Sequence, residues 1–600
     1  MNHEVNSQTH TTKQPNNAKQ APATARKGET PNVITDPKII SMAKAKTATL
    51  PDGFSYTPKG LIYTDPNNDN ASPVWICSKL EVTAKTCDVE SNNWGRVVEF
   101  ADPAGKRKKW VMPMELLAGR GEQLHATLLN MGLSLNGQAR ARNLLAQFIQ
   151  SAPTDKQAIC VTRVGWFEGC YVLPHKTLGD TQGREILLQT PYPDSLGFSE
   201  AGTLEAWRAT VAAYAVGNSR LSFAISAAFT APLLSLIGIE GGGFHFRGGS
   251  SIGKTTALYM AASVWGGHDR KKTWRATVNG LEAAGSSHNN TLLCLDEMGE
   301  ISPKEIGGAV YMLANGQAKQ RMTDTTKPKT WVTLFISTGE LTLKTTMLEA
   351  GTLTRAGQEV RLIDVEADTG AHGIFDAIIE VGGCSGEQAG YLQQATRTNH
   401  GTAGVCFLER FISTRGESLQ AINQTKAQFI AEHTPPNANS QIQRGLNRFA
   451  TVAACGELAT AYGLTGWQQG EAMRGAAACF KSWLNHMGDP SQTDEHKQAL
   501  ERVREFIERY SQSRFDNLAK AQNESPIIQN MAGYKQLEGA QGSESMVYYF
   551  LPTVFKNEVC KGLDLKTVCT ALKAAGVLRF DDGRNTKKSP VVDGGSRFNA

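Results

Sequence analysis

The pattern of hydrophobic and polar positions divides the chain into segments of different character. Residues 1–50 are rich in Asn, Gln, Thr, Lys and Ala and have almost no aromatic residues. Such a segment cannot bury enough apolar surface to offset the conformational entropy that its chain would lose on folding. We therefore expect a mildly basic, disordered polar tail over residues 1–50.

Short apolar runs that alternate with turn-forming residues come next, over residues 51–200. Runs of this kind, bounded by Gly, Pro, Asn and Asp, are typical of strands. They lie at residues 60–63, 73–77, 95–100, 110–112, 159–164 and 170–173. We expect an N-terminal β-rich domain here, which binds nucleic acid or, alternatively, protein.

Strands and helices alternate in the middle of the chain. Residues 203–236 have helical periodicity, and a strand at 244–247 precedes a helix at 255–265. Further strands are predicted at 291–296, 331–337 and 360–365. This alternation is typical of a parallel α/β sheet, which we place at residues 201–370.

Helical periodicity dominates the next part of the chain, most clearly at residues 442–462 and 471–484. We assign residues 371–520 to a helical subdomain. Residues 549–580 follow the order helix, turn, helix, strand, which predicts a winged-helix-like module at residues 521–600.

Bulk composition narrows the function classes. Lys and Arg number 62 against 57 Asp and Glu, so a nucleic-acid partner must be bound by local basic patches. The eleven cysteines are scattered without a CxxC pair, which argues against a zinc module or disulfide framework and favours a reducing cytoplasm. The N-terminus lacks the apolar core of a signal peptide, and the longest mostly apolar run, 224–239, is shorter than the roughly 20 residues of a membrane span. We expect a cytoplasmic protein without a membrane partner.

A glycine-rich stretch lies between the apolar strand at 244–247 and the apolar helix at 255–265. The pattern GxxxxGK[ST] is matched in full by Gly248, Gly249, Ser250, Ser251, Ile252, Gly253, Lys254 and Thr255. In such a loop the backbone N–H groups and the helix N-terminus bind phosphates, the lysine reaches the β- and γ-phosphates and the hydroxyl binds Mg²⁺. We therefore predict ATP (or GTP) and Mg²⁺ as ligands, with Thr256 in the same nucleotide-binding set.

Two later strands end in polar side chains suited to nucleotide hydrolysis. The strand at 291–296 ends in Asp296 and Glu297, which we expect to bind Mg²⁺ and to activate the attacking water, respectively. A switch GTPase normally lacks the second acid, whereas ATP-hydrolysing motors have it. Ser337 or Thr338, at the end of the next strand, is a candidate sensor of the γ-phosphate, although hydroxyls are common at strand ends.

Four arginines are candidates for stabilising charge in the transition state. Arg355 and Arg361 flank residues 356–360, around the start of the strand at 360–365. At this place an arginine of a ring ATPase reaches the γ-phosphate of the neighbouring subunit. Arg444 and Arg448 are four residues apart on a predicted helix, so they share a face, and either could contact the nucleotide of the same subunit. The alternative for all four is an ordinary solvated arginine.

Basic residues form two candidate contacts to nucleic acid. Lys319, Arg321, Lys327 and Lys329 lie between the acidic strand and the Ser337 strand, where helicase-type ATPases carry a hairpin that binds phosphates in the ring channel. An ordinary exposed loop is the alternative. Residues 106–110 are basic with an adjacent tryptophan, which suits single-stranded nucleic acid, but a solvated hairpin tip is the favoured interpretation.

Together with these motifs, several further short sequence segments make the chain resemble a bacterial and phage P-loop family known as the domain of unknown function 927. This family is related to the AAA+ replicative helicases of staphylococcal chromosome cassettes and other mobile elements. The resemblance runs from about residue 54 to the C-terminus. It is carried by residues 165–166, 172–174, 244–255, 279–283, 295–297, 312–316, 337–340, 357–361, 448–450, 456–459 and 463–467.

The resemblance implies a fold, an activity and an assembly. The implied fold is an AAA+ type core. With the N-terminal β-rich domain, the helical lid and the C-terminal winged-helix-like module predicted above from the sequence pattern, the expected fold class is an α/β P-loop NTPase. The activity is ATP-dependent DNA unwinding or translocation by a ring, expected to be a hexamer, during replication of a phage, plasmid or integrated island. The DNA is a single strand in the ring channel and a duplex at the C-terminal module.

The resemblance also implies individual roles. Lys254, Thr255, Asp296 and Glu297 take the nucleotide roles, and Ser337 or Thr338 that of sensor. Arg361 becomes the trans-acting finger and Arg444 or Arg448 the lid sensor. The chain has no primase motifs, so priming requires a separate primase or initiator. A different class of function stays open: an initiator, loader or defence ATPase that assembles on DNA without unwinding it.

Overall fold

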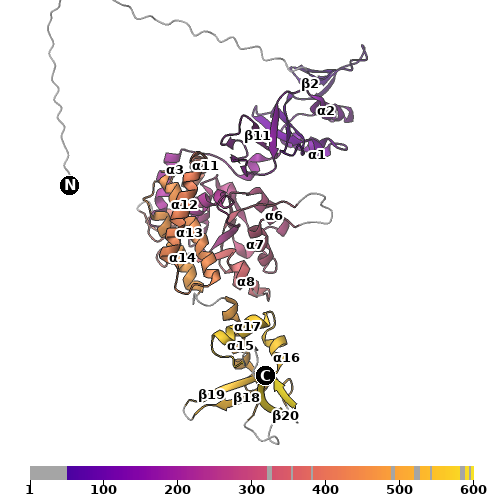
Figure 1. The fold of residues 1–600 in the computed structure, drawn as a ribbon. Coiled ribbons are helices and arrows are strands. Elements are labelled where there is room, and N and C mark those ends of the chain that lie inside the picture. The colour runs from indigo at the N-terminus through magenta and orange to yellow at the C-terminus, as the bar shows by residue number, and fades with distance from the viewer. Residues whose placement is uncertain are drawn as a thin grey trace, which may run out of the picture. The chain divides into compact units, whose positions relative to one another are not determined.

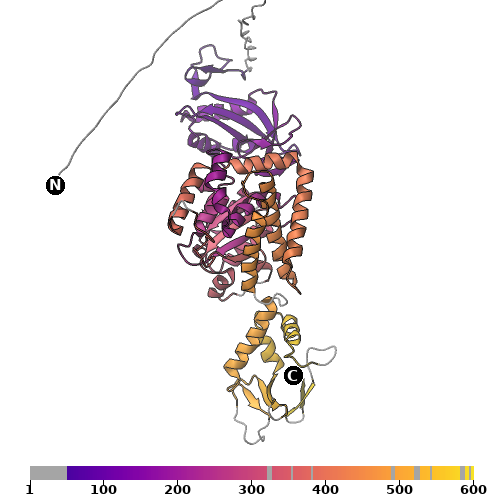
Figure 2. The same ribbon diagram turned by 90° about the vertical axis from the view of Figure 1, so that its left-hand side faces the viewer.

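The computed structural model describes residues 50–319, 328–352, 354, 356–379, 383–487, 494–518, 528–540, 543–580, 588–593 and 596–599. The tail expected before residue 50 lies outside these residues. Figure 1 and Figure 2 show the chain in two views. In the described part of the chain, no helix combines the length and the apolar character that crossing a bilayer requires.

The N-terminal part of the described chain is built mainly from strands, which form three sheets. One sheet is antiparallel and consists of β1 (Phe54–Thr57), β2 (Gly60–Tyr63) and β3 (Val74–Cys77). The largest has the order β11-β7-β4-β5-β6, from β4 (Leu80–Cys87), β5 (Gly95–Ala101), β6 (Arg107–Pro113), β7 (Gln157–Val161) and β11 (Glu185–Leu188). The third contains β8 (Gly165–Phe167), β9 (Cys170–Val172) and β10 (Thr177–Leu178). Two helices, α1 (Glu122–Asn130) and α2 (Ala139–Ser151), pack into the same core as β1–β6.

A five-stranded parallel sheet forms the centre of the chain. Its order is β13-β14-β15-β12-β16, from β12 (Gly242–Arg247), β13 (Lys271–Thr273), β14 (Leu292–Asp296), β15 (Leu334–Gly339) and β16 (Leu362–Glu366). The predicted parallel α/β core is therefore present. Because all five strands run in one direction, their carboxyl ends share one edge. At that edge β15 lies between the strand that enters the glycine-rich loop and the strand that ends in the acids.

Helices cover both faces of this sheet, because its inner strands are apolar at alternate positions on both sides. On β14, Leu292 and Cys294 belong to one apolar core, and Leu293 and Leu295 to another. The first core includes α3 (Leu204–Thr210), α4 (Ser219–Thr230), α5 (Lys254–Ala262), α10 (Ser385–Thr398), α11 (Thr402–Ser413), α12 (Arg415–His433), α13 (Ser440–Ala461) and α14 (Glu471–Met487). The second includes α6 (Val278–Ser287), α7 (Ile306–Asn315) and α8 (Leu343–Glu349), while the short α9 (Ala356–Glu359) precedes β16. Figure 1 shows these two groups of helices on opposite sides of the sheet.

The C-terminal part has its own apolar core. The elements of this part are α15 (Asp494–Tyr510), α16 (Pro552–Val554), α17 (Leu565–Ala574), the sheet of β17 (Phe515–Asn517), β18 (Gly533–Glu538) and β19 (Ser545–Phe550), and the hairpin of β20 (Lys588–Asp593) and β21 (Ser596–Asn599). Val503 and Phe506 of α15 pack in one cluster with Phe515, Val568 and Leu572. The boundary expected at residue 520 therefore falls inside this core. Residues 577–580, where a strand was expected, have no regular secondary structure.

Candidate nucleotide-binding site

A cavity of about 260 Å³ lies at the carboxyl edge of the central sheet. Its walls come from the glycine-rich loop, α5, the ends of β14 and β15, and α10. The lining residues are Ser250, Ser251, Gly253, Lys254, Thr255, Thr256, Asp296, Glu297, Glu340, Ala389 and Gln393. The predicted glycine-rich loop and the predicted acids thus meet in one cavity, although more than 40 residues separate Lys254 from Asp296 along the chain.

The glycine-rich loop is held in a tight conformation before α5 begins at Lys254. Gly253 has φ of 99°, and a Cβ there would lie 2.7 Å from a methyl group of Ile374, so the position requires glycine. The Lys254 ammonium donates hydrogen bonds to the carbonyls of Gly248 (2.6 Å) and Gly249 (2.5 Å). The loop therefore curls around its own lysine, with the N-terminus of α5 facing the cavity.

Asp296 is the most heavily contacted acid of the site. Its Oδ1 accepts a hydrogen bond of 2.5 Å from the Thr338 hydroxyl, and its Oδ2 lies 2.6 Å from the Lys271 ammonium. The Thr255 hydroxyl lies 3.4 Å from both oxygens. Burial lowers the pKa of Lys271, but the hydrogen bond and the charge of Asp296 outweigh it, so the pKa of Lys271 is raised overall and the ammonium stays charged.

Glu297 has an unusual backbone conformation for a residue with a side chain. Its φ is 56°, in the left-handed region that β-carbon sterics disfavour. The backbone N–H of Glu297 donates a hydrogen bond to the Thr338 hydroxyl oxygen at 3.1 Å, and Glu297 lines the cavity. Backbone strain of this kind persists only where surrounding contacts maintain it, and it is frequent at functional sites.

The donor set fits a hydrated Mg²⁺ ion bound together with phosphates. Mg²⁺ prefers oxygen ligands and usually binds one or two protein groups plus phosphate oxygens and water. The Thr255 hydroxyl and the Asp296 carboxylate are adjacent and line the same cavity. Across the described residues, no cluster of three or more His, Cys, Asp or Glu side chains forms an all-protein metal cage. Thr255 and Asp296 are therefore the groups that would hold the ion.

The two candidate sensor residues point in opposite directions, because neighbours on a strand alternate between faces. Thr338 contacts both acids, as described above. Ser337 is fully buried, and its Oγ accepts a hydrogen bond from Trp274 Nε1 at 2.8 Å and lies 2.9 Å from His245 Nδ1. His245 Nε2 lies 3.1 Å from the carbonyl oxygen of Leu341, which places the proton on Nε2. Only Thr338 of the pair is therefore part of the cavity region.

Two of the candidate arginines, Arg361 and Arg448, lie away from this cavity. Arg361 precedes β16, donates to Asn315 Oδ1 (2.9 Å) and stacks over Tyr311 at 4.6 Å from the ring centroid. Arg448 donates to the carbonyl of Gly241 at 2.8 Å, just before β12, and burial lowers its pKa to about 10. Both are thus at the amino-terminal edge of the sheet. A six-residue strand separates this edge from the glycine-rich loop by roughly 16 Å.

This placement bears on the predicted roles of the arginines. Arg448 does not reach the nucleotide cavity of its own chain, so the expected lid-sensor contact is not formed by it. Arg444 is exposed on α13. Arg361 does not reach its own cavity, and its role at a neighbouring subunit stays a prediction. Arg355 lies outside the described residues.

The predicted nucleic-acid contacts are only partly described. Arg321 and Lys327 lie outside the described residues, while Lys319 and Lys329 are exposed. Their backbones lie close together, because the carbonyl of Lys329 accepts from the N–H of Ala318 at 2.9 Å. In the run 106–110, Trp110 is 1% exposed, so it cannot stack on a base and the hairpin interpretation is the one that fits.

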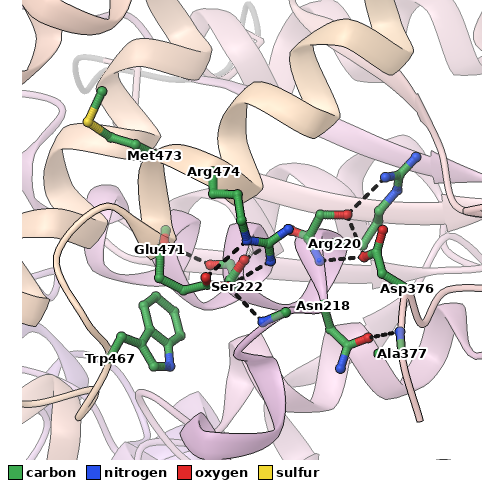
Figure 3. A network of polar contacts seen from close by, with 12 residues as sticks. Asn218, Arg220, Ser222, Asp376, Ala377, Trp467, Glu471, Met473 and Arg474 are labelled. Atoms are coloured by element: carbon green, nitrogen blue, oxygen red, sulfur yellow. Dashed lines mark hydrogen bonds and ion pairs between the residues drawn. The ribbon is translucent and has the colours of Figure 1, made fainter.

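A partly buried polar network joins the starts of α4 and α14 to the segment after β16 (Figure 3). Asp376 accepts hydrogen bonds from the N–H (2.6 Å) and the hydroxyl (2.7 Å) of Ser219 at the start of α4. Arg220 donates to the same hydroxyl at 2.9 Å. At the start of α14, Glu471 forms an ion pair with Arg474 (2.7 Å) and accepts an N–H from the turn before α4 (3.0 Å). Since Ile374 also bonds to the carbonyl of Ile252, the segment after β16 links α4 to the glycine-rich loop.

Three residues of the site were not predicted as functional. Glu340 lines the cavity and directly follows the Ser337–Gly339 strand end, so its position beside a candidate sensor was the available signal. Gln393 of α10 lies 3.4 Å from the Thr256 hydroxyl, and Lys271 lies on the edge strand β13. No spacing or motif in the sequence signals these two, because their contacts arise from tertiary packing and strand register.

Comparison with known proteins agrees with this architecture. The solved structure of "SCCmec type IV Cch - active helicase" has a similar fold, with a TM-score of 0.65 and 20% sequence identity over 89% of this chain and 95% of that chain. The search of curated proteins found no match. The family model described as "Domain of unknown function (DUF927)" matches residues 54–331, which include the glycine-rich loop and both acids. The resemblance expected from the sequence is therefore confirmed over residues 54–331, where the chain matches the model of the domain of unknown function 927.

Proposed function

We propose that this chain is an ATP-dependent DNA helicase or translocase of a mobile genetic element, built on an AAA+ type core. The observation that carries the proposal is the meeting of Lys254, Thr255, Asp296 and Glu297 in one cavity at the carboxyl edge of a parallel sheet. The likeness of its fold to a structure titled as an active helicase supports this choice among nucleotide-hydrolysing functions.

The chemistry assigns each residue of the cavity a separate task. Lys254 leaves the loop carbonyls to bind the β- and γ-phosphates, and the loop N–H groups neutralise the remaining charge. Bound Mg²⁺, held by Thr255 and Asp296, supplies positive charge at the phosphates. Glu297 orients the attacking water and accepts its proton, and Thr338 keeps both acids in place.

The second half of each catalytic site comes from a neighbouring subunit in this proposal. Arg361 projects from the opposite edge of the sheet, where a ring arrangement brings it to the next subunit's nucleotide. An arginine in that role stabilises the negative charge of the transition state. We propose a hexameric ring in which Lys319, Arg321, Lys327 and Lys329 contact a single DNA strand in the channel. In the same proposal the C-terminal winged-helix-like module binds duplex, and a separate primase or initiator acts with the ring.

The test is ATP hydrolysis by the full chain with and without single-stranded DNA, combined with unwinding of a forked duplex. Wild-type protein is expected to hydrolyse ATP faster with DNA and to separate the fork. Lys254→Ala should abolish nucleotide binding or turnover, whereas Lys272→Ala, whose ammonium contacts the Asp269 carbonyl, should leave both unchanged. Slow turnover without stimulation by single strands, together with tight duplex binding, would instead support an initiator, loader or defence ATPase.

A further inference from the structure

Lys271 forms a contact that the proposed hydrolysis does not use. It is the first residue of the edge strand β13 and pairs in register with Cys294, which places its side chain toward the end of β14. Its ammonium lies 2.6 Å from Asp296 Oδ2 and 5.4 Å from the ring centroid of Tyr259 on α5. The side chains of Lys271 and Asp296 are only 22% and 15% exposed, so water screens this pair weakly.

The pair occupies the carboxylate that would hold the metal. Asp296 Oδ1 accepts the Thr338 hydroxyl and Oδ2 accepts the Lys271 ammonium, so both oxygens are engaged. A divalent cation bound between Asp296 and Thr255 would lie within a few ångströms of the ammonium. Two cations at that distance repel strongly in a partly buried site. Binding of one therefore weakens binding of the other.

We infer that Lys271 is a built-in cation that competes with Mg²⁺ for Asp296 and sets the Mg²⁺ concentration at which the chain holds nucleotide. The inference rests on the proposed nucleotide-binding function. Lys271 is a positioning residue in this scheme, because it acts through Asp296. When no metal is bound, it also keeps the buried carboxylate paired, which avoids the cost of an isolated charge.

The neighbouring residue Lys272 offers a matched comparison. It lies on the same strand, and its ammonium donates to the carbonyl of Asp269 at 3.1 Å, away from Asp296. Removing either charge changes the net charge of the protein equally. An effect that is specific to Lys271 therefore reports the contact with Asp296 and not a general electrostatic change.

The experiment titrates Mg²⁺ into full-length protein with a fixed amount of a fluorescent ADP analogue and records bound nucleotide. Lys271→Met keeps the aliphatic stem but loses the ammonium, so the half-saturating Mg²⁺ concentration should fall about fivefold, as loss of one partly buried competing cation implies. Lys272→Met should match the wild type. Lys271→Arg, which keeps a cation at the carboxylate, should retain a high Mg²⁺ requirement. Lys271→Gln provides a second neutral variant where the Met variant does not fold.

The outcomes separate this inference from the proposed function. If wild-type protein binds ADP in a Mg²⁺-dependent manner but both neutral variants have an unchanged or higher Mg²⁺ requirement, the competition is overturned and the proposed function stands. If the wild-type protein binds no ADP at any Mg²⁺ concentration, the proposed function fails and the inference fails with it. A lowered requirement in the neutral variants alone supports the competition.

Discussion

The hydroxyl of Thr338 donates to Asp296 Oδ1 over 2.5 Å and accepts the backbone N–H of Glu297 over 3.1 Å. One side chain from β15 thus contacts both Asp296, the last residue of β14, and the backbone of Glu297, which follows it. This contact matters because Glu297 has a left-handed backbone conformation, which needs external support. The strand order places β15 between β12 and β14, so the support comes from the strand next to both halves of the cavity.

Thr338→Val is expected to separate nucleotide binding from hydrolysis. Valine has nearly the same shape but cannot hydrogen-bond, so Asp296 and Glu297 lose their shared anchor. We expect ADP affinity within about threefold of wild type and an ATP hydrolysis rate at least tenfold lower, since small displacements of catalytic groups are costly. Steady-state hydrolysis and fluorescent-ADP binding measure the two quantities.

Ser337→Ala is the matched control for this variant, because Ser337 is adjacent in sequence but faces the buried His245 and Trp274. It leaves two buried partners unpaired, which costs about 1–3 kcal/mol of folding stability. We expect a lower melting temperature and nearly normal hydrolysis per folded molecule. Equal loss of hydrolysis in both variants would contradict the assignment of Thr338 as the anchor.

Glu297→Gln is expected to retain ATP binding and to lose hydrolysis by about 10²–10⁴-fold, because the amide cannot accept the proton of the attacking water. The substitution keeps the side-chain length and the backbone hydrogen bond to Thr338, so folding should be unaffected. Single-turnover hydrolysis and calorimetric binding of Mg·ATP provide the measurements. Hydrolysis at the wild-type rate would exclude Glu297 as the base.

The strands that carry the site were predictable because each inner strand is buried on both faces and is therefore a continuous apolar run. Residues 291–296 were expected as a strand and correspond closely to the inner strand β14. The strand expected at 360–365 corresponds closely to β16, an edge strand that still carries the apolar residues Leu362, Ile363 and Val365. The edge strand β13 has the sequence Lys-Lys-Thr and lacks this signal. The sequence therefore could not predict the role inferred for Lys271, because that role depends on the register between β13 and β14.

The arginines show a different limit of sequence reasoning. Helical spacing correctly placed Arg444 and Arg448 on one helix, α13. The packing of α13 against α4 and α14 decides which end of the sheet this face of the helix contacts. This packing is a tertiary property, and no local sequence pattern indicates it. The helical spacing of Arg444 and Arg448 therefore could not predict the contact of Arg448 with Gly241.

Arg361→Ala tests the proposed action across a subunit interface. The variant should bind ATP normally, because Arg361 lies at the far edge of the sheet from its own cavity. Hydrolysis should fall by a hundredfold or more, as loss of a transition-state arginine implies. Mixing Arg361→Ala with Glu297→Gln protein should restore part of the activity, since some interfaces then combine an intact glutamate with an intact arginine. Absence of any recovery in confirmed mixed assemblies would argue against the trans role.

The pH dependence of stability should reveal two titratable groups on neighbouring strands, the buried His245 and the half-buried Asp364. His245 on β12 and Asp364 on β16 are register partners. Burial lowers the pKa of His245 to about 4 and raises the pKa of Asp364 to about 7. Both groups are therefore neutral in the folded chain near pH 6, and their effects on stability have opposite signs.

Between about pH 4 and 6.5 the unfolded chain binds more protons at histidine than the folded chain does, so the His245 contribution makes stability fall as pH falls. At Asp364 the folded chain binds more protons over about pH 4–7, so this contribution makes stability fall as pH rises. The two slopes offset each other in the wild type. Asp364→Asn removes the second one, and its stability should then decrease, relative to wild type, by up to about 1.4 kcal/mol for each pH unit below 6.5. His245→Gln should show the opposite trend, with stability that increases relative to wild type as the pH falls.

Thermal unfolding midpoints at pH 7, 6 and 5 measure the difference, which corresponds to a few degrees per pH unit. Asp368→Asn, at an exposed position two residues after β16, is the control. Parallel pH profiles for wild type, Asp364→Asn and His245→Gln would show that neither group keeps a shifted pKa in the folded chain.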